Sequence, residues 1–190
     1  MFFPVRINKI KQKMKGFLAT VGPKPPRLVY AFIEVPRQTS NKYEWKESLN
    51  TFILDRVLYS SVFYPTEYGF IPATKASDGD NLDIMVITTY PTFPSCLVVA
   101  RPLGAISIID SGERDYKILA VAENDPRLEK YKKLTDLPYH LLREIEDFWA
   151  HYARLQPNKK IKVGKWLGKK EAFKIITAAQ KEFAQASKEK

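Results

Sequence analysis

"CLVVARPLGAISIID" (residues 96–110) and "YKILAVAE" (residues 116–123) are the two segments that decide the fold of this chain. Both are strongly apolar and rich in β-branched residues, as strands buried inside a protein are. Further strands are expected in four segments nearer the N-terminus, "RLVYAFIEVP" (27–36), "KYEWK" (42–46), "TFILDRVLY" (51–59) and "LDIMVITTYP" (82–91). Several short strands at close spacing predict a small β-barrel or β-sandwich.

The last third of the chain has a helical pattern instead. In "TDLPYHLLREIEDFWAHYARL" (135–155), the apolar residues trace one face of a helix. Asp136 is expected as its N-cap, with Pro138 in the first turn. A second amphipathic helix is predicted for "KKEAFKIITAAQKEFAQASK" (169–188). Strands first and helices last indicate an α+β domain.

The length and composition of the chain are those of one globular domain. It has 190 residues, 45% of them hydrophobic, and this is enough to bury a substantial core. No apolar run approaches the roughly 20 residues that a membrane-spanning helix needs. Cys96 is the only cysteine, which excludes an intramolecular disulfide and a thiolate zinc site and fits a reduced compartment.

The positive charge of the chain is concentrated at its two ends. The net charge is +10; residues 1–27 carry seven Lys or Arg and no acid, and residues 156–190 carry ten Lys against three Glu. We expect residues 1–27 to be a basic, partly flexible extension and residues 28–190 to be the single domain. The ends either aid solubility or adhere weakly to nucleic acid or anionic membrane, and composition does not separate the two. A cytoplasmic location is expected, with an organellar address left open.

Three aspartates stand close together in "SDGDNLDIMV" (77–86), namely Asp78, Asp80 and Asp83. An EF-hand is excluded, because its loop needs a glycine at position six, which is Asp83 here, and a Glu at position twelve, which is Thr89. A solvated acidic turn is the ordinary interpretation of such a cluster.

A second carboxylate pair changes that interpretation. Asp110 and Asp115 precede Lys117 in "IIDSGERDYKILAV" (108–121), beside a predicted buried strand. The two aspartate groups converge if their strands are neighbours. Carboxylate ligands without His or Cys suit hard divalent cations such as Mg²⁺ or Mn²⁺, and several aspartates imply more than one ion. Two metal ions held together are the arrangement used for in-line attack on phosphorus.

Cations and phenols elsewhere in the chain are candidates for holding a phosphate-containing substrate beside such metals. They are Lys42, Arg56, Lys117, Tyr64, Tyr68 and Tyr152.

Five ordered segments make the chain resemble the family I soluble inorganic pyrophosphatases. They are "FIEVPRQTSNKYEW", "LDRVLYSSVFYPTEYGFIPAT", "DGDNLDIMV", "ARPLGAISIIDSGERDYKILAV" and "HYARLQPNKKIKVGKW", and they lie between about residues 28 and 166. The resemblance implies an OB-like, five-stranded distorted β-barrel with flanking helices. It also implies Mg²⁺-dependent hydrolysis of pyrophosphate to two orthophosphates, and a homo-oligomer that is a hexamer in the family's prokaryotic members.

The resemblance also implies roles for the acidic residues. Asp78, Asp83 and Asp115 match ligands of the tightest metal, and Asp110 joins Asp115 at a further ion. Asp80 matches the general base beside the attacking water. The remaining matches are Glu34, which holds another metal largely through water, and Glu44, which supports the network.

The cations and phenols receive roles by the same comparison. Lys42, Arg56, Lys117 and Tyr152 match groups that hold phosphoryl oxygens. Tyr64 and Tyr68 match polar residues of the active site, and we assign Tyr64 to the substrate and Tyr68 to the catalytic group.

The chain departs from the family pattern at a few positions. Asn81 replaces the usual Pro or Glu, and Gly164 and Lys165 stand where an acid and a glycine are usual. Ala153 replaces a lysine that contacts phosphate, which implies weaker substrate binding or a phosphate held in another way. Two alternatives therefore stay open: a weakened or idle barrel that binds nucleic acid through its basic ends, and a phosphatase acting on longer polyphosphates or nucleotides.

Overall fold

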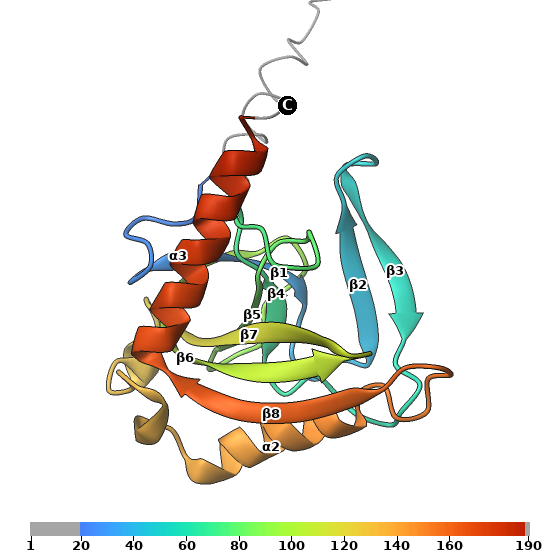
Figure 1. The fold of residues 1–190 in the computed structure, drawn as a ribbon. Helices are drawn as coiled ribbons and strands as arrows, with labels where there is room; N and C mark the ends of the chain where they lie inside the picture. Colours follow the sequence, from blue (N-terminus) through green and yellow to red (C-terminus); the bar gives the residue numbers. More distant parts are fainter. Residues whose placement is uncertain (1–19, 189–190) are drawn as a thin grey trace, which may run out of the picture.

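A computed structural model describes residues 20–188, which fold around one large curled β-sheet with a helix on each of two sides (Figure 1). In chain order the elements are β1 (Val29–Val35), β2 (Asn41–Lys46), β3 (Thr51–Val57), β4 (Glu67–Phe70), β5 (Asp83–Ile87), β6 (Leu97–Asp110), β7 (Glu113–Ala122), the short 3-10 turns η1 (Pro126–Leu128) and η2 (Leu134–Asp136), α2 (Tyr139–His151), β8 (Ile161–Gly168) and α3 (Lys169–Ala186). All six segments expected to hold strands contain one, which confirms the β-rich first half.

The large sheet closes on itself. Its strand order is β1-β4-β5-β7-β6-β8, and β1 also pairs with β6, so that β1, β4, β5, β7 and β6 form a ring. The pair β5 and β7 is parallel, whereas the other pairs are antiparallel. The expected five-stranded barrel with flanking helices is therefore confirmed.

One edge of the long strand β6 serves two partners. Its residues 97–100 pair with β1 and close the ring, whereas residues 104–110 pair with β8. Strand β8 was not predicted from the sequence, because its half-buried and exposed positions do not alternate regularly and two of its residues are lysines. The sequence pattern gives no other sign of a strand there. Strand β4, which has only four residues, all of them buried, was also not predicted.

Alternate residues of the central strands face two apolar clusters, as the period of a β-strand requires. Met85 and Leu119 face the cluster that contains Ile145, Phe148 and Trp149 of α2. The neighbouring residues face a second cluster, which includes Ile84, Ile118, Ala172, Ile176 and Ala179. The three α3 members of that cluster recur at helical spacing, so α2 and α3 each bury one apolar stripe on the sheet.

The ends of α2 differ from the sequence prediction. Asp136 is not its N-cap; it lies in η2, and its carboxylate accepts hydrogen bonds from the backbone N–H groups of Lys132 (2.8 Å) and Lys133 (3.0 Å). Pro138 is the N-cap rather than part of the first turn, with a non-helical ψ of 128°. The helix ends at His151, and Leu155, expected on its apolar face, is 64% exposed.

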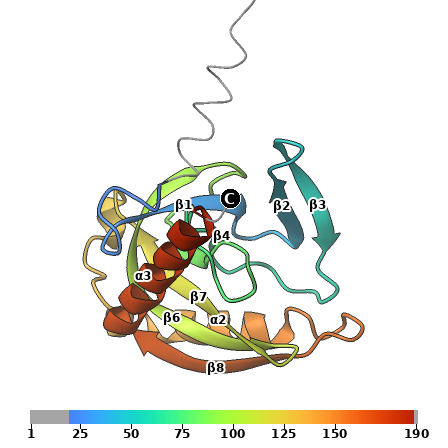
Figure 2. The ribbon, with the colours of Figure 1, turned by 45° about the horizontal axis from the view of Figure 1, so that its top comes forward.

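Strands β2 and β3 form a separate hairpin that stands beside the barrel (Figures 1 and 2). An aromatic cluster joins the two parts: the ring centroid of Phe32 on β1 lies 5.7 Å from those of Trp45 and Phe52, one on each hairpin strand. Together with the other contacts between β1 and β2, these rings hold the hairpin beside the barrel.

The packed chain begins before the expected domain start at residue 28. Val21 is buried, and its carbonyl accepts a hydrogen bond from the N–H of Tyr30 at 2.8 Å. The expected flexible extension falls largely on residues 1–19, which lie outside the described residues. No helix within residues 20–188 is long and apolar enough to cross a membrane.

Gly69→Ala should destabilise the barrel, because a Cβ at this position would collide with the backbone carbonyl of Phe32 where β4 pairs with β1. A backbone clash cannot be relieved by a rotamer change, so we expect the free energy of unfolding to fall by about 1–3 kcal/mol in urea or thermal unfolding. Gly168→Ala is the control, since its Cβ would meet only the flexible carboxylate of Glu171 at 3.2 Å. Equal losses in the two variants would contradict the expectation.

Candidate active site

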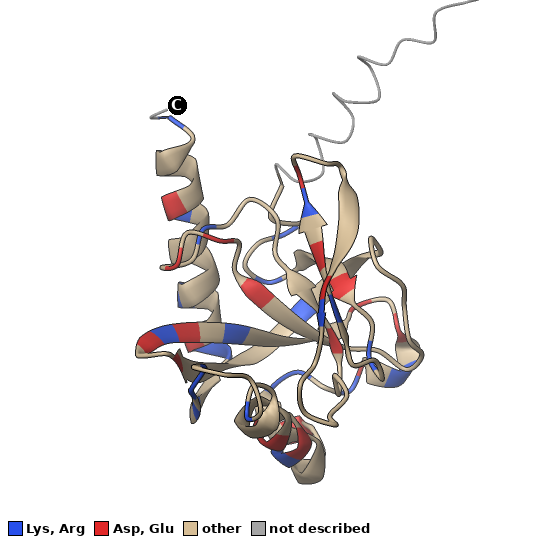
Figure 3. Cartoon of the chain, turned by 90° about the vertical axis from the view of Figure 1, so that its right-hand side faces the viewer, with Lys and Arg blue, Asp and Glu red and all other residues tan. Residues whose placement is uncertain are grey.

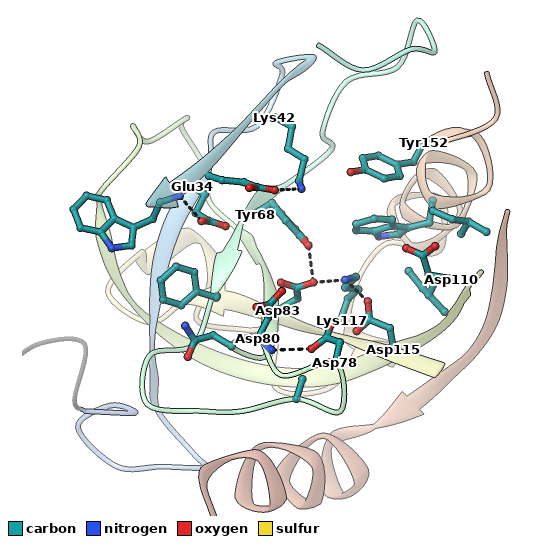
Figure 4. Close-up of a pocket in the computed structure, with 18 of the residues that line it drawn as sticks. Glu34, Lys42, Tyr68, Asp78, Asp80, Asp83, Asp110, Asp115, Lys117 and Tyr152 are labelled. Carbon is teal, nitrogen blue, oxygen red and sulfur yellow. Dashed lines mark hydrogen bonds and ion pairs between the residues drawn. The ribbon is translucent and has the colours of Figure 1, made fainter. Parts of the chain in front are cut away.

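A polar cavity of about 430 Å³ opens between the hairpin, the barrel and the end of α2. Figure 3 shows that basic residues and acidic residues are interspersed on the strands and loops of this part of the molecule. The close-up in Figure 4 shows that Lys42 and Tyr152 lie across the cavity from Asp78 and Asp80. With one exception, Tyr64, every site residue predicted from the sequence lines this cavity.

The two aspartate groups converge because β5, β6 and β7 are neighbours. Asp83 is the first residue of β5, next to Ile84, which pairs with Ile118 of β7. Asp115 lies on β7 opposite Ile108 of β6, and the hairpin between these strands also carries Asp110. The sequence predicted a metal site only if the strands beside the two aspartate groups were neighbours, and the structure meets this condition.

The loop before β5 supplies Asp78 and Asp80. The backbone N–H of Asp80 donates to the Oδ1 atom of Asp78 at 3.0 Å. Gly79 between them has a φ of +94°, a conformation that favours glycine and lets the loop turn sharply. Burial raises the pKa of Asp80, and the negative charges of Asp78 and Asp83 raise it further.

Lys117 occupies the centre of the acidic side. Its ammonium is buried and forms ion pairs with Asp83 and Asp115. Burial alone would lower the pKa of Lys117, but the two carboxylates outweigh this effect and raise it. The hydroxyl of Tyr68 donates to the same Asp83 oxygen at 2.6 Å, so that the Asp83 carboxylate is held by both groups.

The acidic residues fit a hard divalent cation. Their donor atoms are all carboxylate oxygens, the ligands that Mg²⁺ and Mn²⁺ prefer. Asp83 and Asp115 already share one positive group, the Lys117 ammonium, which shows that a cation can be bound between them. Within residues 20–188, no three acidic, His or Cys side chains are arranged as a ready metal cage.

Glu34 links the barrel to the hairpin. Its carboxylate, on β1, accepts a hydrogen bond from the backbone N–H of Trp45 on β2 at 2.8 Å. Burial raises the pKa of Glu34 from 4.5 to about 7, although the Trp45 hydrogen bond acts in the opposite direction.

The hairpin supplies the cations on the opposite side. Lys42 on β2 and Arg56 on β3 are register partners, so both side chains belong to the same face. The ammonium of Lys42 contacts Glu44 at 2.5 Å. The Arg56 guanidinium donates to the Tyr152 hydroxyl at 2.7 Å, across to the end of α2. Asp55 on β3 forms ion pairs with both cations. The hairpin thus brings two cations, each held by carboxylates, to the side of the cavity that faces the aspartates.

Tyr64 lies beneath the cavity rather than in its lining. It is 1% exposed, and its ring centroid lies 5.4 Å from that of Tyr68 and 4.8 Å from that of Phe148. Its predicted contact with the substrate stays a prediction. The structure gives it a packing position that supports the ring of Tyr68.

The departures from the family pattern lie in different surroundings. Asn81 lines the cavity, whereas Ala153 is 3% exposed and belongs to the apolar cluster under α2. A Cβ at Gly164 would collide with Ser107 of β6, whose hydroxyl accepts a hydrogen bond from the N–H of Lys165 at 2.9 Å. The small residue on β8 is thus explained by the close approach of β6.

Two cations of the cavity were missed by sequence reasoning, Lys46 on the hairpin and Lys159. Lys159 is the one outside the hairpin. It lies in the irregular segment between α2 and β8, and its ammonium contacts the Asp110 carboxylate at 2.8 Å. Its position inside the segment "HYARLQPNKKIKVGKW" was the available signal, but a lysine next to Lys160 in a loop is ordinarily solvated.

Comparison with known proteins agrees with this site. A family model described as inorganic pyrophosphatase matches residues 31–184. The chain belongs to the inorganic pyrophosphatase family. The resemblance stated from the sequence is thereby confirmed.

Individual pyrophosphatases support the assignment along most of the chain. The inorganic pyrophosphatase of Geobacillus stearothermophilus is 47% identical over 150 residues, 79% of this chain and 90% of that protein. That of Synechocystis is 48% identical over 149 residues, 78% of this chain and 86% of that protein. The crystal structure of the Thermus thermophilus inorganic pyrophosphatase superposes with a TM-score of 0.85 at 38% identity, over 88% of this chain and 99% of that one.

Glu34→Gln should change how stability depends on pH in the presence of EDTA. Because the pKa of Glu34 is about 7 in the fold and 4.5 ordinarily, the folded state binds its proton more tightly between these values. The stability from this group is therefore complete below pH 4.5 and is lost as the pH rises through 7. Glutamine keeps an acceptor for the Trp45 N–H but does not ionise. We expect the variant to gain roughly 1–3 kcal/mol over the wild type between pH 5 and pH 8 in denaturant unfolding.

Glu129→Gln, a substitution at an exposed acid, is the matched control and should show no such gain. Parallel pH profiles for the wild type and Glu34→Gln would contradict the expectation.

Proposed function

We propose that this chain hydrolyses inorganic pyrophosphate to two orthophosphates with the help of divalent cations bound by its aspartates. The observation that carries the proposal is that aspartates of the barrel side (Asp78, Asp80, Asp83 and Asp115) and cations of the hairpin (Lys42 and Arg56) line one cavity. Figure 4 shows Lys42 across the cavity from Asp78 and Asp80. An anion accompanied by metal ions fits such a cavity, and the named relatives support pyrophosphate as that anion.

The acidic residues divide into ligands and a base. Asp78, Asp83 and Asp115 would hold the tightest ion, and Asp110 would join Asp115 at a second. When bound, Mg²⁺ or Mn²⁺ lowers the pKa of a coordinated water and neutralises phosphate charge. Asp80 lies between two of these ligands in the sequence and would accept the proton of the attacking water.

The remaining polar residues bind the phosphates and hold the groups that do so. Lys42, Arg56 and Lys117 stabilise the charge that develops on the leaving phosphate. The Tyr152 hydroxyl orients Arg56 and the Tyr68 hydroxyl orients Asp83, since each forms the hydrogen bond described above. Glu44 would position Lys42, and Glu34 would support a further ion through water while it holds the hairpin.

Assembly and location complete the proposal. A homo-oligomer, hexameric by family resemblance, is supported by exposed apolar side chains on β3 and the segment after it: Leu54, Val57, Tyr59 and Phe63. A cytoplasmic location agrees with the bacterial relatives. The alternative of a nucleic-acid-binding barrel with an idle site has less support, because the cavity keeps all the expected carboxylates.

Orthophosphate release from pyrophosphate, ATP and tripolyphosphate, each with and without Mg²⁺, tests the function directly. We expect rapid release from pyrophosphate only, and only with the metal. Comparable release from ATP or tripolyphosphate would favour the relaxed phosphatase, and no release from any substrate would favour the idle barrel.

Asp80→Asn should abolish most turnover while it leaves metal binding nearly intact. The amide keeps the shape of the side chain but cannot take a proton, so kcat should fall at least about 100-fold. Calorimetry should show Mg²⁺ binding within a few-fold of the wild type. Asp147→Asn, on the exposed face of α2, is the matched control and should have normal kcat. Near-normal turnover in Asp80→Asn would remove it as the base.

A further inference from the structure

Lys159 brings a positive charge into the cavity from a direction that no other described cation uses. The cations that line the cavity on the hairpin are Lys42, Lys46 and Arg56, and Lys117 lies at the base among the aspartates. Lys159 comes from the opposite side, after the end of α2 and before β8. Its side chain is 27% exposed, so most of it is removed from solvent.

The segment that carries Lys159 is held at the end that leads into β8. The carbonyl of the next residue, Lys160, accepts a hydrogen bond from the N–H of Ser111 at 2.9 Å. Immediately afterwards Ile161 begins β8 and pairs with Asp110 of β6. The position of Lys159 beside Asp110 is therefore fixed by strand pairing rather than by the side chain alone.

The end of α2 offers a phenol but no cation to this wall. Tyr152 lines the cavity, but the next residue is the buried Ala153 and the following Arg154 is exposed and does not line the cavity. Among the described lysines and arginines, Lys159 alone reaches the cavity from this side. A phosphate near the Tyr152 hydroxyl would thus meet Lys159 from this wall, in addition to Arg56 of the hairpin, which donates to that hydroxyl.

The ammonium of Lys159 can move from its partner, the Asp110 carboxylate, to a phosphate. Asp110, at 2.8 Å, is itself a proposed metal ligand. A carboxylate that shares its charge with a divalent ion attracts an ammonium less strongly, whereas a phosphate brings new negative oxygens within reach. The lysine stem is long and flexible, so the charge can move between the two without movement of the backbone.

We propose that Lys159 is a further substrate-binding residue, whose ammonium donates hydrogen bonds to phosphoryl oxygens on the wall formed by α2 and β8. This inference rests on the proposed function and names the residue that gives that wall its affinity for phosphate. It differs from a purely electrostatic role, in which Lys159 only neutralises Asp110.

The test compares Lys159→Met with Lys159→Arg and with the neighbouring control Lys160→Met. Lys160 is exposed and does not line the cavity, so its loss removes the same charge at nearly the same place in the chain. At saturating Mg²⁺ we expect Lys159→Met to raise the KM for pyrophosphate at least about tenfold, with a smaller effect on kcat, because a charged hydrogen bond to substrate is lost. Lys159→Arg should restore part of the affinity, and Lys160→Met should change neither constant.

Binding of methylenediphosphonate, which cannot be hydrolysed, gives a measurement that does not depend on turnover. Calorimetry with Mg²⁺ should show a loss of affinity in Lys159→Met of the same factor as the rise in KM. Unchanged analogue affinity together with tighter Mg²⁺ binding would assign Lys159 to Asp110 alone and overturn the proposal. An equal loss in Lys160→Met would overturn it as well.

These measurements also separate this inference from the proposed function. A wild-type chain that binds the analogue but releases no orthophosphate fails the function, while the variants still decide the role of Lys159. Circular dichroism and thermal unfolding show whether Lys159→Met is folded. If it is not, the affinity of Lys159→Gln for methylenediphosphonate, compared with that of the wild type, decides the result.

Discussion

The contact of Lys117 with Asp83 and Asp115 is the interaction on which the site depends. Two carboxylates and one ammonium are partly or fully buried together, and each would be costly to bury without the others. The parallel pairing of β5 and β7 brings them side by side, and that pairing is one of those that form the ring. Barrel closure and site geometry are therefore consequences of the same strand order.

Strand periodicity made much of the barrel predictable. The segments 82–91, 96–110 and 116–123 are recognisable as strands from their apolar, β-branched composition, because both faces of such strands contact apolar neighbours. Strands β4 and β8 are not recognisable in this way. Strand β4 is too short to show a hydrophobic pattern, and β8 is only partly buried. The closing pair of β1 with β6 is also invisible locally, because it joins residues far apart in the sequence.

Some site residues were likewise predictable from the sequence around them, whereas others were placed only by contacts in the fold. The aspartates are recognisable because acids beside buried strands are unusual, and the ordered family segments assigned their expected roles. Asp136 misled the prediction because its carboxylate binds the backbone of the preceding turn rather than that of α2. Lys159 escaped notice because a loop lysine has no distinguishing pattern until the pairing of β6 and β8 places it. A local backbone contact decided the position of Asp136, whereas a tertiary contact decided that of Lys159.

The divided edge of β6 has a consequence for how this molecule tolerates change. Since β1 closes the ring with residues 97–100 alone, the part of the chain from the end of α2 through β8 forms a layer laid against a barrel that is already complete. Substitutions and length changes in that layer alter one rim of the cavity without threatening the closure that holds the aspartates. Tyr152 and Lys159 thus belong to the outer layer, whereas Asp83 and Asp115 belong to the strands of the ring.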